Sequence, residues 1–505
     1  MDGTIIVGLD GANWELLRPW LSAGRLPNLR SLRERGIEAD LRSCLPPVTC
    51  PNWRCYSTGK NPGKLGVFWW EKIDVESRTL TTPTARSFES ANFWEYLNDE
   101  GHSMGVMNLP MTYPPFDVDE FMIAGGPGSE PEGYAHPPSL EAELDAAGYR
   151  LHPERPVASS DDRAAATAVV DLIDERLETF RGLLAEREVD VAHCTVFYSN
   201  VLQHFFWRDE PTRRAWERID AHLGALRDEH PEATLVLLSD HGCGPIETVF
   251  HANSWLEHEG YLRTERDASD VATTVGLDKQ RISALAHRLG VHDVVTRLTP
   301  ERVKRAMPED DSGFKRERKL EKIDWEHTRA VASGQGLVYT TDEATTDALC
   351  RDLRSLESPI TGEPIARAVF RREEAYDGPH VEAAPQIVFE QALGVHTSGA
   401  IGDNPPFTGT GHWTAENTPT GLFLADGPGV RGDLDGAASR VSITDVAPTV
   451  LASVGNRVPT DMDGEVLPLF EDRDVEYRDP LPFEGGGTAA GSEVRNRLKG
   501  LGYLE

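Results

Sequence analysis

Cysteine is scarce in this chain. Six cysteines are spread over 505 residues, and no two of them form a C-x-x-C pair. A scaffold held together by several disulfides, or a structural zinc site built from cysteine pairs, is therefore not expected. The six positions are Cys44, Cys50, Cys55, Cys194, Cys243 and Cys350.

Long apolar runs are also missing. No stretch approaches the roughly 20 apolar residues that a helix needs to span a bilayer. The first residues, MDGTIIVGLDG, have neither the basic head nor the long apolar segment of a secretion signal. We therefore expect no membrane segment and a cytoplasmic location.

Positive charge is in deficit, because 51 basic residues stand against 83 acidic ones and give a formal net charge of −32. Such a chain is not expected to bind a nucleic-acid polymer or an anionic membrane. Only nine of the basic residues are lysine, and 42 are arginine. An acidic, lysine-poor surface suits concentrated salt, where screening weakens self-repulsion. We therefore take a halophilic origin as a hypothesis.

What the sequence does contain is an alternation of apolar runs with helical patterns. Helical periodicity covers about 160–187, a segment from about 200, and 211–229. This alternation predicts an α/β fold whose mostly parallel central sheet is flanked by helices. The predicted strands are 4–10, 103–110, 121–126, 190–198 and 234–240.

The pattern changes after residue 262. Residues 263–325 show helical periodicity without a convincing strand, and we expect a helical insertion, or cap, there. Strand-like segments resume with RAVAS, GLVYT, APQIVFE and GLFLAD. We therefore expect one discontinuous core, made of residues 1–262 and 326–472. A tail with a glycine-rich joint and a short helix is expected over 473–505.

Polar side chains follow two of the predicted strands. TIIVGLD ends at Asp10, and TLVLLSDHG ends at Asp240 and His241. Ligands of open parallel sheets bind beyond the carboxyl ends of the strands, so these groups are expected to lie near one another. Taken alone, Asp10 could simply cap the following helix, and Asp240-His241 could be a polar turn.

Two further segments carry groups that can bind a metal. Asn200 and His204 are spaced i, i+4 and would share one helical face, and His412 lies in the glycine-rich segment GTGTGHWT. Alone, His204 would more simply be a core histidine. Together with the strand ends, these groups indicate a divalent cation, and mixed carboxylate and imidazole ligands suit zinc.

The motifs resemble a known family. DGANWELLRPWLSAGRLPNLRSLRERG, PPVTCPNW, STGKNPGKLG, QHFFW, LSDHG, GTGHW and ITDVAPTVLASVGNRVPTDMDGEVL occur in this order. They look like the alkaline phosphatase superfamily, in particular its type I phosphodiesterase/nucleotide pyrophosphatase branch. The resemblance runs from residue 4 to about 470. It implies an alkaline-phosphatase-like core and a hydrolase of phosphoric esters.

The resemblance also assigns the nucleophile. The family places it two residues before a proline, which here is Thr49. The related sulfatases use a cysteine in a C-x-P-x-R pattern, and neither Cys50 nor Cys55 fits it. A threonine hydroxyl is too weakly acidic to attack phosphorus unaided, so it needs a metal or a base. The resemblance thus implies a covalent intermediate on Thr49, formed when Thr49 attacks a phosphodiester or nucleotide pyrophosphate and later removed by water.

Two divalent cations are implied as cofactors, zinc or alternatively Mn²⁺ or Mg²⁺. By resemblance, one is held by Asp10, Thr49, Asp240 and His241, and the other by Asn200, His204 and His412. Relatives carry aspartate where this chain has Asn200, so occupancy of the second site is in question.

Other activities stay open on the same scaffold: a phosphomonoesterase, a sulfatase-like hydrolase, or a phosphoryl or headgroup transferase. A non-hydrolytic binding protein is the alternative from another class. The expected partner is a small phosphoric ester. The sequence does not identify the leaving group, the substrate-binding residues or the oligomeric state.

Overall fold

The computed structural model describes residues 3–75, 77–157, 159–264, 323–402, 404–430, 440–470, 474–483 and 497–498. Nearly all of the expected cap at 263–325 lies outside the described residues, as do the expected glycine-rich joint and most of the expected terminal helix. Among the described helices, none has the length and apolar character needed to cross a bilayer.

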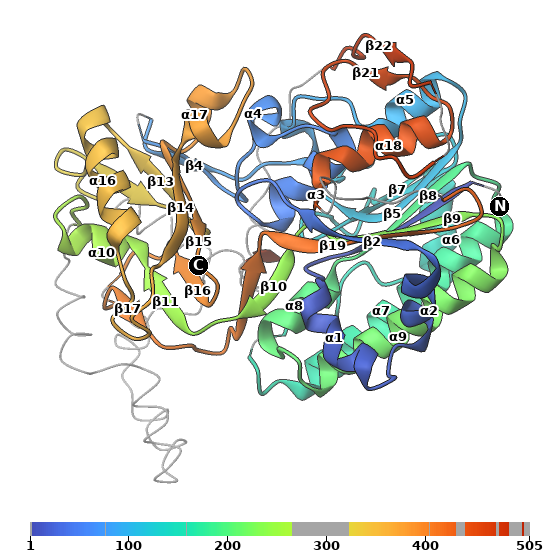
Figure 1. Cartoon of the computed structure of the whole chain (residues 1–505), viewed down its shortest axis with the longest axis horizontal. Coiled ribbons are helices and arrows are strands. Elements are labelled where there is room, and N and C mark those ends of the chain that lie inside the picture. Colours follow the sequence, from blue (N-terminus) through green and yellow to red (C-terminus); the bar gives the residue numbers. More distant parts are fainter. Residues whose placement is uncertain are drawn as a thin grey trace, which may run out of the picture.

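A nine-stranded central sheet forms the larger part of the molecule (Figure 1). Five neighbouring strands run parallel to one another: β9, β1, β8, β5 and β6. β19 and β7 run antiparallel to their neighbours in the sheet. This confirms the predicted α/β fold with a mostly parallel sheet. In order across the sheet, the strands are β20 (Arg440–Ser442), β2 (Ile37–Arg42), β19 (Thr420–Asp426), β9 (Thr234–Leu238), β1 (Thr4–Leu9), β8 (Val191–Val196), β5 (Met104–Pro110), β6 (Phe121–Gly125) and β7 (Ala135–His136).

Helices cover both faces of this sheet (Figure 1). One face carries α1 (Trp14–Ser22), α2 (Pro27–Arg35), α7 (Arg163–Glu186), α8 (Tyr198–Phe205) and α9 (Glu210–Glu229). The other carries α3 (Thr49–Thr58), α5 (Phe93–Asp99) and α18 (Val446–Ser453). Two further helices are α4 (Pro62–Leu65) and α6 (Pro138–Ala146).

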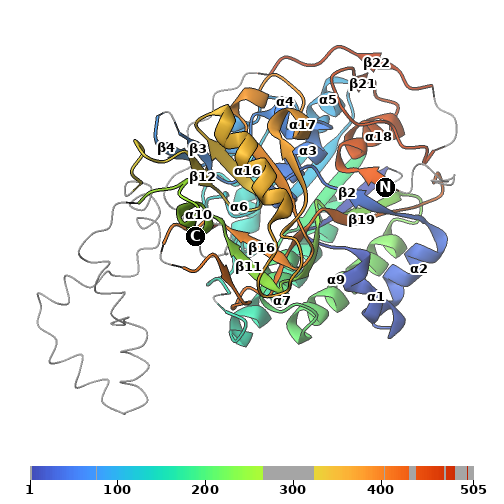
Figure 2. The ribbon, with the colours of Figure 1, turned by 60° about the vertical axis from the view of Figure 1, so that its left-hand side comes forward.

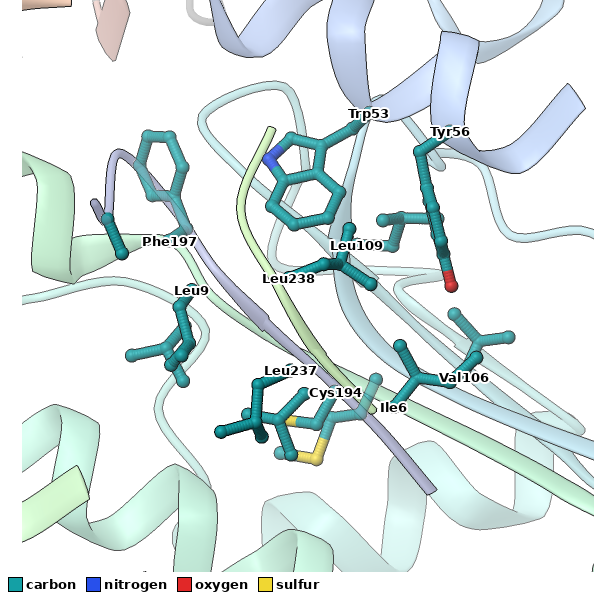
Figure 3. Packing of buried hydrophobic residues seen from close by; sticks show 14 of the residues in the cluster. Ile6, Leu9, Trp53, Tyr56, Val106, Leu109, Cys194, Phe197, Leu237 and Leu238 are labelled. Carbon is teal, nitrogen blue, oxygen red and sulfur yellow. The ribbon is translucent and has the colours of Figure 1, made fainter. Parts of the chain in front are cut away.

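The strands are buried on both sides because each face packs against helices. Figure 3 shows Trp53 and Tyr56 of α3 on one side of the strands and Leu237 and Cys194 on the other. All four side chains are buried. The near-continuous apolar runs in the sequence therefore reflect burial on both faces.

A second, smaller body has its own antiparallel sheet, in the order β12 (Ala330–Ala332), β13 (Leu337–Thr340), β15 (Ile387–Gln391) and β14 (Ala366–Arg371). Helix α16 (Glu343–Ser355) packs on this sheet (Figure 2). Most buried residues of this smaller body belong to a hydrophobic cluster separate from that of the core, whereas Leu337 and Val388 belong to the core cluster. Of the strand-like segments after residue 325, only GLFLAD joins the central sheet, as β19.

Short strands connect the two bodies. A three-stranded sheet contains β16 (Val395–Ser398), β11 (Thr248–His251) and β17 (Phe407–Thr408), and helix α10 (Ala252–His258) follows β11. β10 (Gly242–Pro245) pairs with β18 (Ala415–Thr418). The remaining elements are β3 (Lys72–Asp74), β4 (Thr79–Thr81), α17 (Arg372–Ala375), β21 (Val458–Pro459) and β22 (Tyr477–Arg478), where β22 places part of the expected tail against β21.

Candidate active site

Two neighbouring parallel strands bring Asp10 and Asp240 together. Gly8 of β1 pairs with Leu238 of β9, and each aspartate lies two residues further along its chain. Both carboxylates are fully buried. The backbone N–H of Gly11 donates to Oδ1 of Asp240 at 3.3 Å, which ties the two strand ends to each other.

His241 completes a compact group with the two aspartates. Its Nε2 lies 3.1 Å from Oδ2 of Asp240 and 3.8 Å from Oδ1 of Asp10. Its Nδ1 lies 2.9 Å from the carbonyl oxygen of Gly242. With the hydrogen on Nδ1 donated to this carbonyl, Nε2 is the ring nitrogen that faces the carboxylates and would offer its lone pair to a bound cation, as in a metal-binding histidine.

Thr49 contacts this group of side chains from another element, helix α3. It begins α3, directly after the extended residue Val48. Its hydroxyl donates to Oδ1 of Asp10 at 3.3 Å and lies 3.4 Å from Nε2 of His241. Four residues further on, the indole nitrogen of Trp53 donates to Oδ2 of Asp10 at 2.8 Å. Both oxygens of Asp10 are thus held by α3.

The electrostatics of this group reflect two carboxylates in a dry environment. Burial, and next the charge of Asp240, raise the pKa of Asp10 well above its usual value. Burial opposes protonation of His241, but the charges of Asp240 and Asp10 outweigh it and raise its pKa to about 9. A bound cation would relieve the repulsion between the carboxylates.

The donor set fits one divalent cation. Asp10, Asp240 and His241 each offer an atom within 4.8 Å of the others. Among the described residues, it is the one group of three or more His, Cys, Asp or Glu side chains whose ligand atoms lie this close together. Carboxylate oxygens, an imidazole nitrogen and the nearby Thr49 hydroxyl form a mixed N/O set that suits zinc.

Asn200 and His204 lie next to this group on α8. The side chain of Asn200 packs against Gly11, where a Cβ would meet its Oδ1 at 2.2 Å. Since Gly11 has a φ of +70°, glycine is needed there on two grounds. The Nδ1 of His204 lies 2.7 Å from the carbonyl oxygen of Ala415, and its ring stacks on Trp413 at 3.8 Å. The structure therefore places Asn200 against the residue that follows Asp10, and His204 against the segment 413–415.

His412 is placed differently from the other expected ligands. It is exposed, and its Nδ1 lies 3.4 Å from the hydroxyl of Ser160. From this part of the chain, Asn417 contacts Asn200: its Oδ1 accepts a hydrogen bond from Nδ2 of Asn200 at 3.3 Å.

Cys50 and Cys55, the two cysteines that follow Thr49 on α3, are fully buried. Burial raises the pKa of the Cys50 thiol, whose sulfur lies 3.9 Å from the carbonyl oxygen of Trp69. Burial also raises the pKa of Cys55 well above its usual value. Because the thiolate is the reactive form, both thiols are poor nucleophiles.

Sequence reasoning did not single out Trp53 or Asn417. Trp53 could have been found, because it lies four residues after Thr49 and a helix would place it one turn away. No local signal marks Asn417, because the pairing of β18 with β10 alone brings it to Asn200.

The chain matches the family model described as type I phosphodiesterase/nucleotide pyrophosphatase over residues 4–413. It therefore belongs to this family and is a hydrolase of phosphoric esters. This confirms the resemblance in the sequence motifs. Among the curated protein sequences, none matches this chain.

Several solved structures share the fold at low sequence identity. Phosphonoacetate hydrolase from Sinorhizobium meliloti, in complex with phosphonoformate, has a TM-score of 0.54 and 16% identity, covering 90% of this chain and 95% of its own. The wild-type alkaline phosphatase PafA has a TM-score of 0.53 and 11% identity, covering 92% of this chain and 98% of its own. An inactive variant of murine ectonucleotide pyrophosphatase/phosphodiesterase 5, in complex with AMP, has a TM-score of 0.50 and 13% identity, covering 90% and 96%. These likenesses confirm the alkaline-phosphatase-like fold.

Proposed function

We propose that this protein hydrolyses small phosphodiesters or nucleotide pyrophosphates through a covalent intermediate on Thr49. The observation that carries the proposal is the position of the Thr49 hydroxyl, 3.3 Å from Asp10 and 3.4 Å from His241. The phosphonoacetate hydrolase and the AMP complex noted above support the substrate class, because their ligands carry phosphonate or phosphate groups.

The residues of the site divide the work. Asp10, Asp240 and His241 would hold a divalent cation, which when bound stabilises a threonine alkoxide and neutralises phosphoryl oxygens. The Thr49 hydroxyl points its hydrogen at Asp10, which can accept the proton as the bond between Oγ1 and phosphorus forms. The bond from phosphorus to the leaving oxygen then breaks. In the second step, water attacks phosphorus, the bond from phosphorus to Oγ1 breaks, and Asp10 returns its proton to Oγ1. The proton that water gives up goes to the solvent, which also supplies a proton to the leaving oxygen.

Turnover of nitrophenyl esters tests the proposal. Wild type is assayed on bis-nitrophenyl phosphate with Zn²⁺, Mn²⁺ or Mg²⁺, beside Thr49→Ala and Thr49→Ser. We expect metal-dependent release of nitrophenol that falls at least about 10³-fold in Thr49→Ala and survives in part in Thr49→Ser, as loss of a nucleophile predicts. Thr58→Ala is the matched control, because Thr58 lies on the same helix and its hydroxyl donates to the carbonyl oxygen of Arg54.

Other outcomes point to the alternatives. Faster turnover of nitrophenyl phosphate or nitrophenyl sulfate would indicate a monoesterase or a sulfatase-like enzyme. Transfer of the phosphoryl group to an added alcohol would indicate a transferase. No metal-dependent turnover of any ester, or full activity in Thr49→Ala, would overturn the proposal, and the former would favour a binding protein.

A further inference from the structure

We propose that this chain holds one divalent cation per active site, and that an amide pair, Asn200 with Asn417, takes the place of a second cation. The inference rests on the proposed function, because it concerns the same site. The family typically binds two metal ions. The residues present here fit the first ion and not the second.

The amide pair lies next to the cation site, because Asn200 contacts Gly11. Nδ2 of Asn200 donates to Oδ1 of Asn417 at 3.3 Å, and both side chains are buried. Asn200 presses against Gly11, the residue after Asp10, so closely that no Cβ fits between them. Nε2 of Gln203 also donates to Oδ1 of Asn200, at 3.3 Å. The pair is therefore held in a fixed position one residue from the metal-binding strand end.

The second half of the pair is positioned by strand pairing. Cys243 of β10 lies opposite Asn417 of β18, and β10 begins directly after His241. Helix α8 packs on both of these strands. Asn417 also lines a narrow recess together with Pro47, two residues before Thr49. Asn417 therefore lies near the loop that leads to Thr49.

The charges match one cation. Asp10 and Asp240 supply two carboxylates, which balance a single divalent ion. The side chains that hydrogen-bond to one another in and beside the pair, Asn200, Asn417 and Gln203, are all neutral amides. Among the described residues, these amides bring no charge that could balance a second divalent ion in this buried place.

The nearest carboxylate on β18 is already engaged. Glu416 precedes Asn417, but its Oε1 accepts from Gln335 and its Oε2 contacts Nδ1 of His396. The backbone N–H of Asn417 also donates to Oε1 of Glu416 at 2.7 Å. Turning Glu416 toward the amide pair would break all three contacts and leave His396 without its counter-ion.

An amide pair can do part of the work of a cation. Amide N–H groups donate to phosphoryl oxygens, and fixed donors in a water-free site stabilise the charge that develops there. The nitrogen of Asn417 carries two hydrogens, and its oxygen is already used by Asn200. We assign Asn417 as the donor to a phosphoryl oxygen and Asn200 as the residue that positions it.

Metal stoichiometry tests the first half of the inference without any turnover. Wild type, Asn200→Asp and the double variant Asn200→Asp/Asn417→His are titrated with Zn²⁺ and with Mn²⁺ by calorimetry, and bound metal is counted by elemental analysis. We expect one equivalent in wild type and a second in the double variant. Asn200→Asp should take up a second ion at a concentration at least about 10-fold below any at which wild type does. Two equivalents of similar affinity in wild type would overturn the inference. Thermal melts verify folding, and Asn200→Asp keeps the test decisive if the double variant does not fold.

Binding of inorganic phosphate to the metal-loaded protein tests the second half. Asn417→Leu should weaken phosphate binding about 10-fold or more while bound metal stays at one equivalent. Asn28→Leu, remote on α2, is the matched control. Unchanged phosphate affinity in Asn417→Leu would contradict the assigned donor. None of these readouts depends on ester hydrolysis, so failure of the proposed function is distinguishable from failure of this inference.

Discussion

The indole nitrogen of Trp53 donates a 2.8 Å hydrogen bond to Oδ2 of Asp10, the carboxylate whose other oxygen accepts the hydroxyl of Thr49. One helix thus carries both the proposed nucleophile and the group that orients a metal-binding carboxylate. Outer contacts of this kind fix the ligand and favour its charged form.

Replacing Trp53 by phenylalanine should weaken metal binding. The hydrogen bond from Trp53 lowers the pKa of Asp10, against the larger effect of burial, so its loss raises that pKa further. A cation binds the deprotonated carboxylate, so the midpoint of metal binding should move to higher pH. We expect roughly 10-fold weaker binding at pH 7, measured by calorimetry with Zn²⁺ or Mn²⁺. Trp216→Phe, a buried tryptophan on α9, is the control, and equal affinities in both variants would refute the role of Trp53.

Acid should destabilise the protein through His193. Burial lowers the pKa of His193 from 6.5 to about 3, and its ring nitrogens lie 2.9 Å from the Tyr56 hydroxyl and 2.7 Å from the Thr195 hydroxyl. Between these two pKa values the unfolded chain binds a proton that the folded chain does not, so stability falls as the pH falls below 6.5.

Urea unfolding at several pH values measures this effect. The contribution of His193 to the loss between pH 7.5 and pH 5 should be about 2 kcal/mol. His193→Gln should be less stable at pH 7.5 but should lose less on acidification. His258→Gln, at an exposed position, should follow wild type. A variant with the same pH dependence as wild type would show that another group is responsible.

His412→Ala should leave metal content and turnover within about twofold of wild type, as expected for a surface substitution. His412 is exposed and lies 3.4 Å from Ser160. Asp240→Asn is the companion variant, and it should lose the bound ion because it removes one of two balancing carboxylates. Elemental analysis of both proteins checks this. Loss of metal in His412→Ala would return that residue to the ligand set implied by the resemblance.

Salt should stabilise the folded chain. The net charge of −32 disfavours the compact state through self-repulsion, which screening relieves. We expect the melting temperature to rise by several degrees between about 0.02 and 0.3 M NaCl, where the Debye length falls from about 20 to about 6 Å. An uncharged osmolyte at matched osmolality controls for general solvent effects. A melting temperature indifferent to salt would remove the support for a halophilic origin.

The sequence predicted the central sheet well because burial on both faces leaves a local signature. The apolar runs at 4–10 and 234–240 became β1 and β9, and the helical periodicity at 160–187 became α7. Three of the four strands of the smaller body, β12, β13 and β15, were also visible as strand-like segments. Their separate sheet was not, because an apolar run specifies a strand but not its partner.

The sequence by itself determined that Asp10, Asp240 and His241 would follow buried strands, because hydrophobic periodicity and strand ends are local properties of the chain. Only the tertiary structure decided that Thr49 lies over Asp10, that Asn417 contacts Asn200, and that His412 faces Ser160. These positions depend on how α3 crosses the sheet and on how β18 pairs with β10. Such contacts join residues far apart in the chain, and no local pattern of side chains records them.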